Sequence, residues 1–292
     1  MIPKQILARV RQIEIKTRKW VNAVFSGEYE SIFKGRGMEF DDVREYFPGD
    51  DVRAIDWNVT ARTGFPHVKK FVEERELTVM LVVDMSSSGL FGTRQRLKLD
   101  MAVEISALLA FSAIKNNDRV GLVLFTDRVE LFIPPKKGRR HVLRLVRELL
   151  TFKPAHVKTD LAGVLEHLNK TLKRRAIVFL LSDFMSLGYE KALAITNRKH
   201  DVVALTLFDP AERGLSDFGV MNLEDAETGL ESVVDTGDRS FRQAFGRGRD
   251  RETAERLRIF RSIDLDHVDI STDKDYIVPL IGFFKERLRR FR

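Results

Sequence analysis

The chain has 292 residues, 43% of them hydrophobic, and its 50 lysines and arginines exceed its 43 aspartates and glutamates to give a net charge of +7. At roughly 100–200 residues per domain, this length fits one large domain or two modest ones. The sequence contains no cysteine, which excludes disulfides and thiolate metal sites. The modest basic excess does not by itself indicate a nucleic-acid partner, because charged surfaces mostly serve solubility.

The first 76 residues differ in character from the rest. Helical spacing of apolar residues runs from Ile2 to about Val24. The stretch 35–66 is rich in glycine, proline and charge, which forbids a long helix, while aromatic residues such as Trp57 suggest that it packs on something. We therefore expect residues 1–76 to form an N-terminal helix and an ordered arm that packs on the main domain.

A second interpretation applies to the motif YFPGDDVRAIDW, residues 46–57. It either holds the arm against the sheet through Trp57 or offers a second docking surface. The sequence alone leaves both readings open.

Strands and helices alternate regularly from Leu77 to Asp209. Short continuous apolar runs of this kind are typical of strands buried on both faces, and they occupy residues 77–84, 119–127, 176–183 and 201–209. A further run at 128–135 is predicted to turn back on the strand before it. Helical patterns separate the runs, so residues 77–209 predict an α/β fold with a doubly wound, mainly parallel sheet flanked by helices.

The remaining residues, 210–292, have a weaker pattern. We expect a β-hairpin that turns near Glu227-Thr228-Gly229, a helix over 238–263, one further strand at 266–272 and a final helix from Tyr276. These elements would complete the same domain.

Polar side chains gather where three segments of this predicted fold reach one edge of the sheet. Asp84, Ser86 and Ser88 follow the first buried strand, Asp183 ends the third, and Thr159 opens the helix that precedes that third strand. In a parallel sheet, ligands bind in the crevice beyond the carboxyl ends of the strands. Alternate residues of a loop can point the same way, so the D-x-S-x-S stagger allows its three side chains to converge.

Two carboxylates and three hydroxyls form an all-oxygen donor set. Such a set suits a hard divalent cation, with Mg²⁺ first and Mn²⁺ or Ca²⁺ as alternatives. Two formal negative charges leave the ion electrophilic, so an aspartate or glutamate from a partner protein could complete its shell. The competing interpretation is purely structural, because serine, threonine and aspartate are also the preferred caps of helices.

The pattern D-x-S-x-S, then a threonine opening a helix, then an aspartate closing a later strand resembles the metal-ion-dependent adhesion site of von Willebrand factor A domains. The resemblance covers residues 77–209 and implies a Rossmann-type fold. It also implies that Ser86, Ser88 and Thr159 contribute hydroxyl oxygens to the ion, while Asp84 and Asp183 hold it largely through coordinated waters.

The flanking motifs narrow this resemblance. The arm, together with DPAERGL (209–215) and LEDAETGL (223–230), is similar to a bacterial family called domain of unknown function fifty-eight. Members of that family carry this kind of domain and are commonly encoded beside MoxR-type AAA+ ATPases. The resemblance implies that such an ATPase is the partner and that the pair acts in maturation or assembly of other proteins.

Two departures from the adhesion-site pattern concern the ion. Many of these domains place small glycines before the metal threonine, whereas Val157 and Lys158 stand here, and a lysine ammonium would compete with the cation. Phe184 follows Asp183 where these domains often have glycine, and its larger side chain predicts narrower access to the ion.

Other functions have weaker signals. The sequence has no Walker A loop and no G-x-S-x-G elbow, and its histidines, His156 near Thr159 included, lack paired metal-ligand spacing. The N-terminus lacks the unbroken apolar stretch of a signal peptide, and the longest nearly apolar run, 105–114, is far shorter than the ~20 residues of a membrane-spanning helix. We therefore expect a cytoplasmic, non-enzymatic, metal-dependent interaction module. The alternatives are a nucleic-acid-binding protein that uses the basic clusters 136–140 and 285–292, or, with less support, a metal-assisted hydrolase.

Overall fold

A six-stranded sheet forms the centre of the computed structural model, which describes residues 4–21, 38–73, 76–93 and 96–290. Its strands lie in the spatial order β10 (Asp266–Ser271), β7 (Asp201–Phe208), β6 (Ile177–Ser182), β3 (Thr78–Asp84), β4 (Arg119–Phe125) and β5 (Val129–Lys136). All neighbouring pairs are parallel except β4 with β5, which form the predicted turned-back pair. The predicted mixed α/β architecture with a mostly parallel sheet is confirmed.

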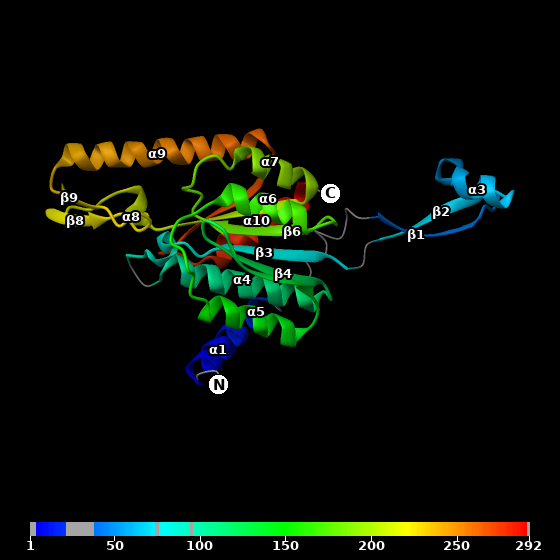
Figure 1. The fold of residues 1–292 in the computed structure, drawn as a ribbon, viewed down its shortest axis with the longest axis horizontal. Coiled ribbons are helices and arrows are strands. Elements are labelled where there is room, and N and C mark those ends of the chain that lie inside the picture. Colours follow the sequence, from blue (N-terminus) through cyan, green and yellow to red (C-terminus); the bar gives the residue numbers. More distant parts are fainter. Residues whose placement is uncertain (1–3, 22–37, 74–75, 94–95, 291–292) are drawn as a thin grey trace.

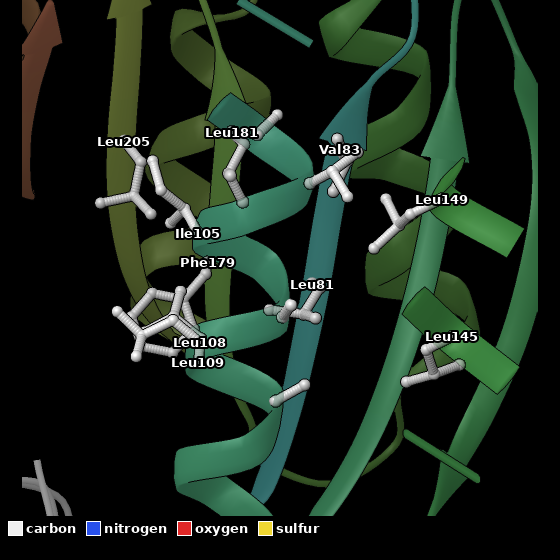
Figure 2. Packing of buried hydrophobic residues seen from close by; sticks show 14 of the residues in the cluster. Leu81, Val83, Ile105, Leu108, Leu109, Leu145, Leu149, Phe179, Leu181 and Leu205 are labelled. Atoms are coloured by element: carbon white, nitrogen blue, oxygen red, sulfur yellow. The ribbon is translucent and has the colours of Figure 1, made fainter. Parts of the chain in front are cut away.

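Helices cover both faces of this sheet because its central strands are apolar on both sides. Successive residues of β3 point to opposite faces, so Leu81 and Val83 join one buried cluster while Met80 and Val82 join the other. The first cluster packs under α4 (Lys98–Lys115) and α5 (Arg139–Thr151), as Figure 2 shows for Leu81, Val83 and the leucines of both helices. The second packs under α6 (Leu161–Thr171) and α7 (Glu190–Lys199).

The order of the strands fixes where a ligand site can lie. The chain passes from β3 to β4 on one side and later returns to place β6 on the other side of β3. Successive connections therefore leave β3 in opposite directions, and this reversal opens a crevice beyond the carboxyl ends of β3 and β6. Asp84 and Asp183 lie at those two ends.

The N-terminal segment has two parts. Helix α1 (Lys4–Trp20) packs against α4 and α5, while β1 (Met38–Glu45) and β2 (His67–Glu73) form an antiparallel hairpin that extends from the body of the molecule (Figure 1). The 3-10 turn η3 (Val52–Ala54) and α3 (Trp57–Thr63) lie between these two strands. The predicted end of the first helix near Val24 falls outside the described residues.

The expectation that Trp57 holds the arm against the sheet is wrong. Trp57 is 69% exposed, and Phe47 and Phe65 are exposed as well. All three aromatic residues belong to the segment that connects β1 to β2. Since they are not buried against the sheet, a second docking surface stays the remaining prediction for this motif.

The C-terminal third follows the predicted order of elements. A short helix, α8 (Pro210–Arg213), leads to the antiparallel hairpin of β8 (Val220–Glu224) and β9 (Glu231–Asp235). Helix α9 (Arg239–Ser262) runs from this hairpin back along the body (Figure 1). Strand β10 then joins the sheet beside β7, and α10 (Ile277–Arg290) follows it. In the part of the chain that the structure describes, no helix is both long and apolar enough to cross a bilayer.

His200, at the C-terminal end of α7, makes the stability of the fold depend on pH. Its side chain is fully buried, and its unprotonated Nδ1 accepts a hydrogen bond from the Ala176 amide, 3.3 Å away. Burial, with Lys199 and Arg175 nearby, lowers the pKa of His200 to about 4. The unfolded chain therefore takes up this proton at a higher pH than the folded chain does. The contribution of the neutral ring is complete above pH 6.5 and is lost as the pH falls toward 4.

We expect His200→Asn to remove this part of the pH dependence, since an asparagine can still accept from the Ala176 amide but does not titrate. Urea unfolding at pH 7 and pH 5 should show a loss of stability about 2 kcal/mol smaller in His200→Asn than in wild type. His167→Asn, at an exposed position, is the matched control and should behave as wild type. An unchanged pH dependence in His200→Asn would contradict the assignment.

Candidate metal centre

Asp84 ends β3 as a half-buried carboxylate whose hydrogen-bond donors are neutral. Its Oδ2 accepts a hydrogen bond from the Ser182 hydroxyl at 2.7 Å, and its Oδ1 accepts one from the Ser86 amide at 3.0 Å. Within the described residues, no lysine or arginine forms an ion pair with it. Burial and the nearby charge of Asp183 together raise the pKa of Asp84 to about 7. The site thus holds a carboxylate that would gain from an added positive charge.

The two serine hydroxyls predicted as ligands lie together. Ser86 Oγ and Ser88 Oγ are 3.1 Å apart, and Ser86 is only 1% exposed. They flank Ser87 at the start of the 3-10 turn η4 (Ser87–Leu90), yet the Ser86 side chain makes no capping hydrogen bond to that turn. Ser86 therefore occupies the N-cap position of the turn, but capping does not account for its hydroxyl.

Asp183 is fixed in place from two sides. Its Oδ2 accepts a hydrogen bond from Lys98 Nζ at 2.9 Å, and its Oδ1 accepts one from the Met185 amide at 3.2 Å. Burial alone would raise the pKa of Asp183, but the charge and hydrogen bond of Lys98 outweigh it and hold that pKa below its usual value. Asp183 is therefore a carboxylate at neutral pH.

Phe184 helps to hold Asp183 at the edge of the sheet. Its φ of 58° is in the left-handed region, which is strained for a bulky side chain. Its ring is buried between Tyr189 and Phe260, with edge-on ring contacts to both. This aromatic packing stabilises a backbone turn for which glycine would be the unstrained choice.

The competing cation at this site is Lys98 and not Lys158. Lys158 is exposed, whereas the Lys98 side chain is 3% exposed and lies between Asp183 and Glu212, whose Oε1 is 2.6 Å from Nζ. Glu212 also accepts from the Asp209 amide at 2.8 Å, which completes a capping box at the start of α8. The residues DPAE thus link the end of β7 to the candidate metal centre.

Thr159 reaches the same edge through its loop. Ser87 donates from its amide and its hydroxyl to the Val157 carbonyl, each at 3.1 Å. These bonds tie the loop that carries Thr159 to the serine turn, residues 86–90. The cap of α6 is Asp160, whose carboxylate accepts from the Gly163 amide. The Thr159 hydroxyl is free of that role and instead donates to Glu227 Oε1 at 2.7 Å.

The structure therefore brings four of the five predicted ligands close together: Ser86 contacts Asp84 and Ser88, and Asp84, Ser88 and Asp183 line one small cavity. It places the fifth, Thr159, on a loop bonded to the same turn. His156 is paired elsewhere, with its Nδ1 3.8 Å from Asp127. A cavity of about 20 Å³, room for about one water molecule, is lined by residues that include Asp84, Ser88, Lys98 and Asp183.

The donor set fits a hard cation that keeps coordinated water. Across the described ranges, no group of three or more histidine, aspartate or glutamate side chains is placed to hold a metal ion. A centre at this edge would accordingly depend on hydroxyl oxygens from Ser86, Ser88 and Thr159 beside the two carboxylates. Mg²⁺ usually keeps several waters and is held by one or two carboxylates with other oxygen donors.

Comparison with known proteins gives the family. The family described as "Protein of unknown function DUF58" matches residues 42–255. The chain belongs to this family. An uncharacterized protein of Mycobacterium tuberculosis is 32% identical over 288 residues, which cover 98% of this chain and 90% of that protein. The uncharacterized protein YeaD of Bacillus subtilis is 30% identical over 107 residues, 37% of this chain and 25% of that protein.

Among solved structures, an aerotolerance-related membrane protein from Bacteroides fragilis, crystallised with multiple mutations to serine, is similar in fold to this DUF58 chain. The TM-score is 0.50 at 14% sequence identity, and the match covers 73% of this chain and 99% of that protein. Identity this low shows only that the two chains share the mixed α/β fold.

Four residues of the site in this DUF58 protein escaped sequence reasoning: Ser182, Lys98, Glu212 and Glu227. Ser182 reads as the last polar residue of a buried strand, and Lys98 as an ordinary helix residue. Glu212 had a signal, since D-P-A-E is a capping-box spacing. Glu227 was read only as part of a turn, and its contact with Thr159 spans 68 positions in the sequence.

Lys98→Met should destabilise the DUF58 fold strongly. The change keeps the apolar stem but leaves the carboxylates of Asp183 and Glu212 without their ammonium partner. Breaking a buried ion pair in this way costs about 3–5 kcal/mol, which urea unfolding at pH 7 without divalent ions would measure. The matched control is Lys170→Met, whose pair with Glu166 is exposed and whose loss should cost less than about 1 kcal/mol. Equal losses in the two variants would contradict a buried electrostatic role for Lys98.

Proposed function

We propose that this protein is a metal-dependent interaction module. In this proposal Asp84, Ser86, Ser88, Thr159 and Asp183 hold one divalent cation, Mg²⁺ in the first place, at the carboxyl edge of the sheet. The bound ion supplies an electrophilic centre that an acidic side chain of another protein can ligate. The chain's own residues position the ion and keep it at the surface of the crevice between β3 and β6.

One observation carries the proposal: side chains with oxygen atoms from the ends of β3 and β6 and from the turn at Ser88 line one small cavity, and the loop that carries Thr159 is hydrogen-bonded to that turn. The capping interpretation accounts for neither Ser86 nor Thr159. Asp84 and Asp183 lie near each other, and the buried Lys98 ammonium pairs with Asp183 and Glu212 but forms no ion pair with Asp84. Burying charge without compensation is unfavourable, so a cation at this position would stabilise the arrangement.

The partner is inferred from the similarity to the DUF58 family described above. We infer a MoxR-type AAA+ ATPase that offers an aspartate or glutamate to the ion, with the pair acting in maturation or assembly of other proteins. This chain would supply the recognition surface and the ATPase the energy. The sequence has no G-x-S-x-G elbow and no histidines with paired metal-ligand spacing, which favours recognition over hydrolysis.

The contacts of the basic clusters favour this proposal over nucleic-acid binding. Lys137 pairs with Glu76, and Arg139 donates to Glu14 from its Nε at 2.7 Å. At the other cluster, Arg287 is buried and pairs with Asp201 and with Asp266. Cations engaged in intramolecular ion pairs contribute less to phosphate binding than free ones.

Added Mg²⁺ or Mn²⁺ should raise the melting temperature of the wild-type protein by several degrees. A ligand at 100 times its dissociation constant stabilises by about 2.7 kcal/mol, and each kcal/mol shifts a chain of this size by about 2–4 °C. Ser86→Ala/Ser88→Ala removes two donors and should show no shift in the same melting experiment. The control Ser240→Ala/Ser262→Ala removes two hydroxyls from the distant helix α9 and should show the same rise in melting temperature as wild type. Identical shifts in all three proteins would remove the metal proposal.

Capture of the proposed partner, a MoxR-type AAA+ ATPase, should depend on the ion. We expect binding of the purified ATPase to the immobilised chain to fall with EDTA and with Thr159→Val, which removes one hydroxyl without changing the size of the side chain. Trp57→Ala probes the arm as the alternative surface. If EDTA and Thr159→Val leave capture intact while Trp57→Ala abolishes it, the partner docks on the arm.

A further inference from the structure

The segment between β1 and β2 is a folded element rather than a loose connection. The Arg44 guanidinium donates to both carboxylate oxygens of Asp50 at 2.7 Å each, and Asp50 Oδ2 also accepts from the Phe47 amide at 3.0 Å. The carboxylate of Asp56 caps α3. Residues 46–66, which we call the arm tip, therefore have a defined structure at the end of the projecting hairpin (Figure 1).

The arm tip exposes three aromatic side chains that the core does not use. Phe47 is 62% exposed, Trp57 69% and Phe65 68%. Apolar side chains left in water contribute little to stability, and several of them on one element are typical of an interaction surface. Because the arm tip is already ordered, a partner that covers these rings loses little conformational entropy on binding.

A cavity of about 540 Å³ lies between the loop after β6 and the helices α8 and α9. Its apolar lining includes Phe184, Met185, Leu187, Tyr189 and Ile259. Leu187 is 93% exposed and Met185 45% exposed, so neither is covered by the rest of the chain. An aromatic side chain that entered the cavity would remove these apolar groups from water, which is the main favourable contribution to protein association.

Arginine side chains make the cavity suited to aromatic rings in particular. Arg213, Arg249, Arg251 and Arg256 all line it. A guanidinium packs favourably on the face of an aromatic ring, and that of Arg213 already lies 3.5 Å from the centroid of the Phe208 ring. Because five acidic side chains also line the cavity, this stacking and not a net charge of the cavity favours an aromatic occupant.

The arm tip and the cavity lie at opposite ends of the sheet. Strand β2 precedes the amino end of β3, whereas the cavity follows the carboxyl ends of β6 and β7, which run parallel to β3. In Figure 1 the arm accordingly projects to the right, away from α8 on the left. The arm tip is thus directed away from the cavity of its own molecule, and a second molecule is needed to bring the two surfaces together.

The charges of the chain favour a second copy as the partner of the arm. Residues 38–73, which comprise β1, β2 and the arm tip, contain eight acidic and five basic residues and carry a net charge of −3. The whole chain carries +7, so the remainder carries +10. An acidic arm with exposed aromatic rings is complementary to a basic body that has an arginine-lined apolar cavity.

We propose that the arm tip of one molecule docks in the cavity beside Asp183 of a second molecule, with Trp57 as the anchoring side chain. The contact joins two different surfaces, so the outer molecules keep one free arm tip and one free cavity, and the assembly grows head to tail. It requires no metal ion. Asp183 lines both this cavity and the candidate metal centre, so a docked arm tip covers one side of that centre.

Sedimentation velocity of the full chain over a concentration series tests the contact. Wild type should form oligomers whose size rises with concentration. Trp57→Ala and Leu187→Asp should each associate at least about 10-fold more weakly, because each alters the anchor of one of the two surfaces. Val278→Asp is the matched control, since Val278 is 70% exposed on α10 and does not line the cavity, and it should assemble as wild type does.

A mixture of the two variants shows whether the occupant of the cavity is the arm tip. Trp57→Ala keeps an intact cavity and Leu187→Asp keeps an intact arm tip, so equimolar mixing should give a 1:1 dimer and nothing larger. Both variants should melt at the wild-type temperature, because both side chains are exposed in the single molecule.

Three results would overturn the inference: a wild type that stays monomeric at every concentration, variants that assemble as wild type does, or a mixture in which the two variants do not pair. The first result would leave the arm tip available to a different protein. None of the three bears on the metal proposal, because the assembly is measured without divalent ions.

Discussion

The arrangement depends on two carboxylates, Asp84 and Asp183, held near each other at the ends of neighbouring parallel strands. Two neighbouring carboxylates repel each other. Hydrogen bonds from neutral donors stabilise Asp84, and the Lys98 ammonium stabilises Asp183. Lys98 compensates Asp183 and is shared with Glu212, so Asp84 is left with hydroxyl and amide donors only. A divalent cation bound here would compensate the negative charge of Asp84, which no lysine or arginine of the described residues neutralises.

The surroundings of this pair show how distant segments are recruited to one edge of a sheet. The capping box of α8 delivers Glu212 to Lys98, and Ser182 links the end of β6 to Asp84. The hairpin turn delivers Glu227 to Thr159 from the C-terminal third of the chain. Two short motifs that mark the DUF58 resemblance, DPAERGL and LEDAETGL, therefore have a physical role, because each places a glutamate at the candidate site.

The projecting arm exposes large aromatic side chains to solvent. Its aromatic residues were expected to be buried, since large apolar side chains gain about 2–3 kcal/mol from burial. Instead Trp57 and Phe65 are largely exposed on a hairpin that extends from the body (Figure 1). Exposed aromatic residues grouped on one projecting element are typical of interaction surfaces. The arm and the candidate metal centre are thus two distinct surfaces of this molecule.

The sequence by itself determined the alternation of strands and helices, because apolar runs and helical spacing are local patterns. It also determined that Asp84, Ser86, Ser88 and Asp183 would lie at one edge, since the carboxyl ends of parallel strands must meet there. Only the tertiary structure decided that Lys98 is the buried cation, that Trp57 is exposed, and that Glu227 contacts Thr159. Those outcomes depend on how a helix, an arm and a hairpin far apart in the chain are placed relative to the sheet, and no local pattern carries that information.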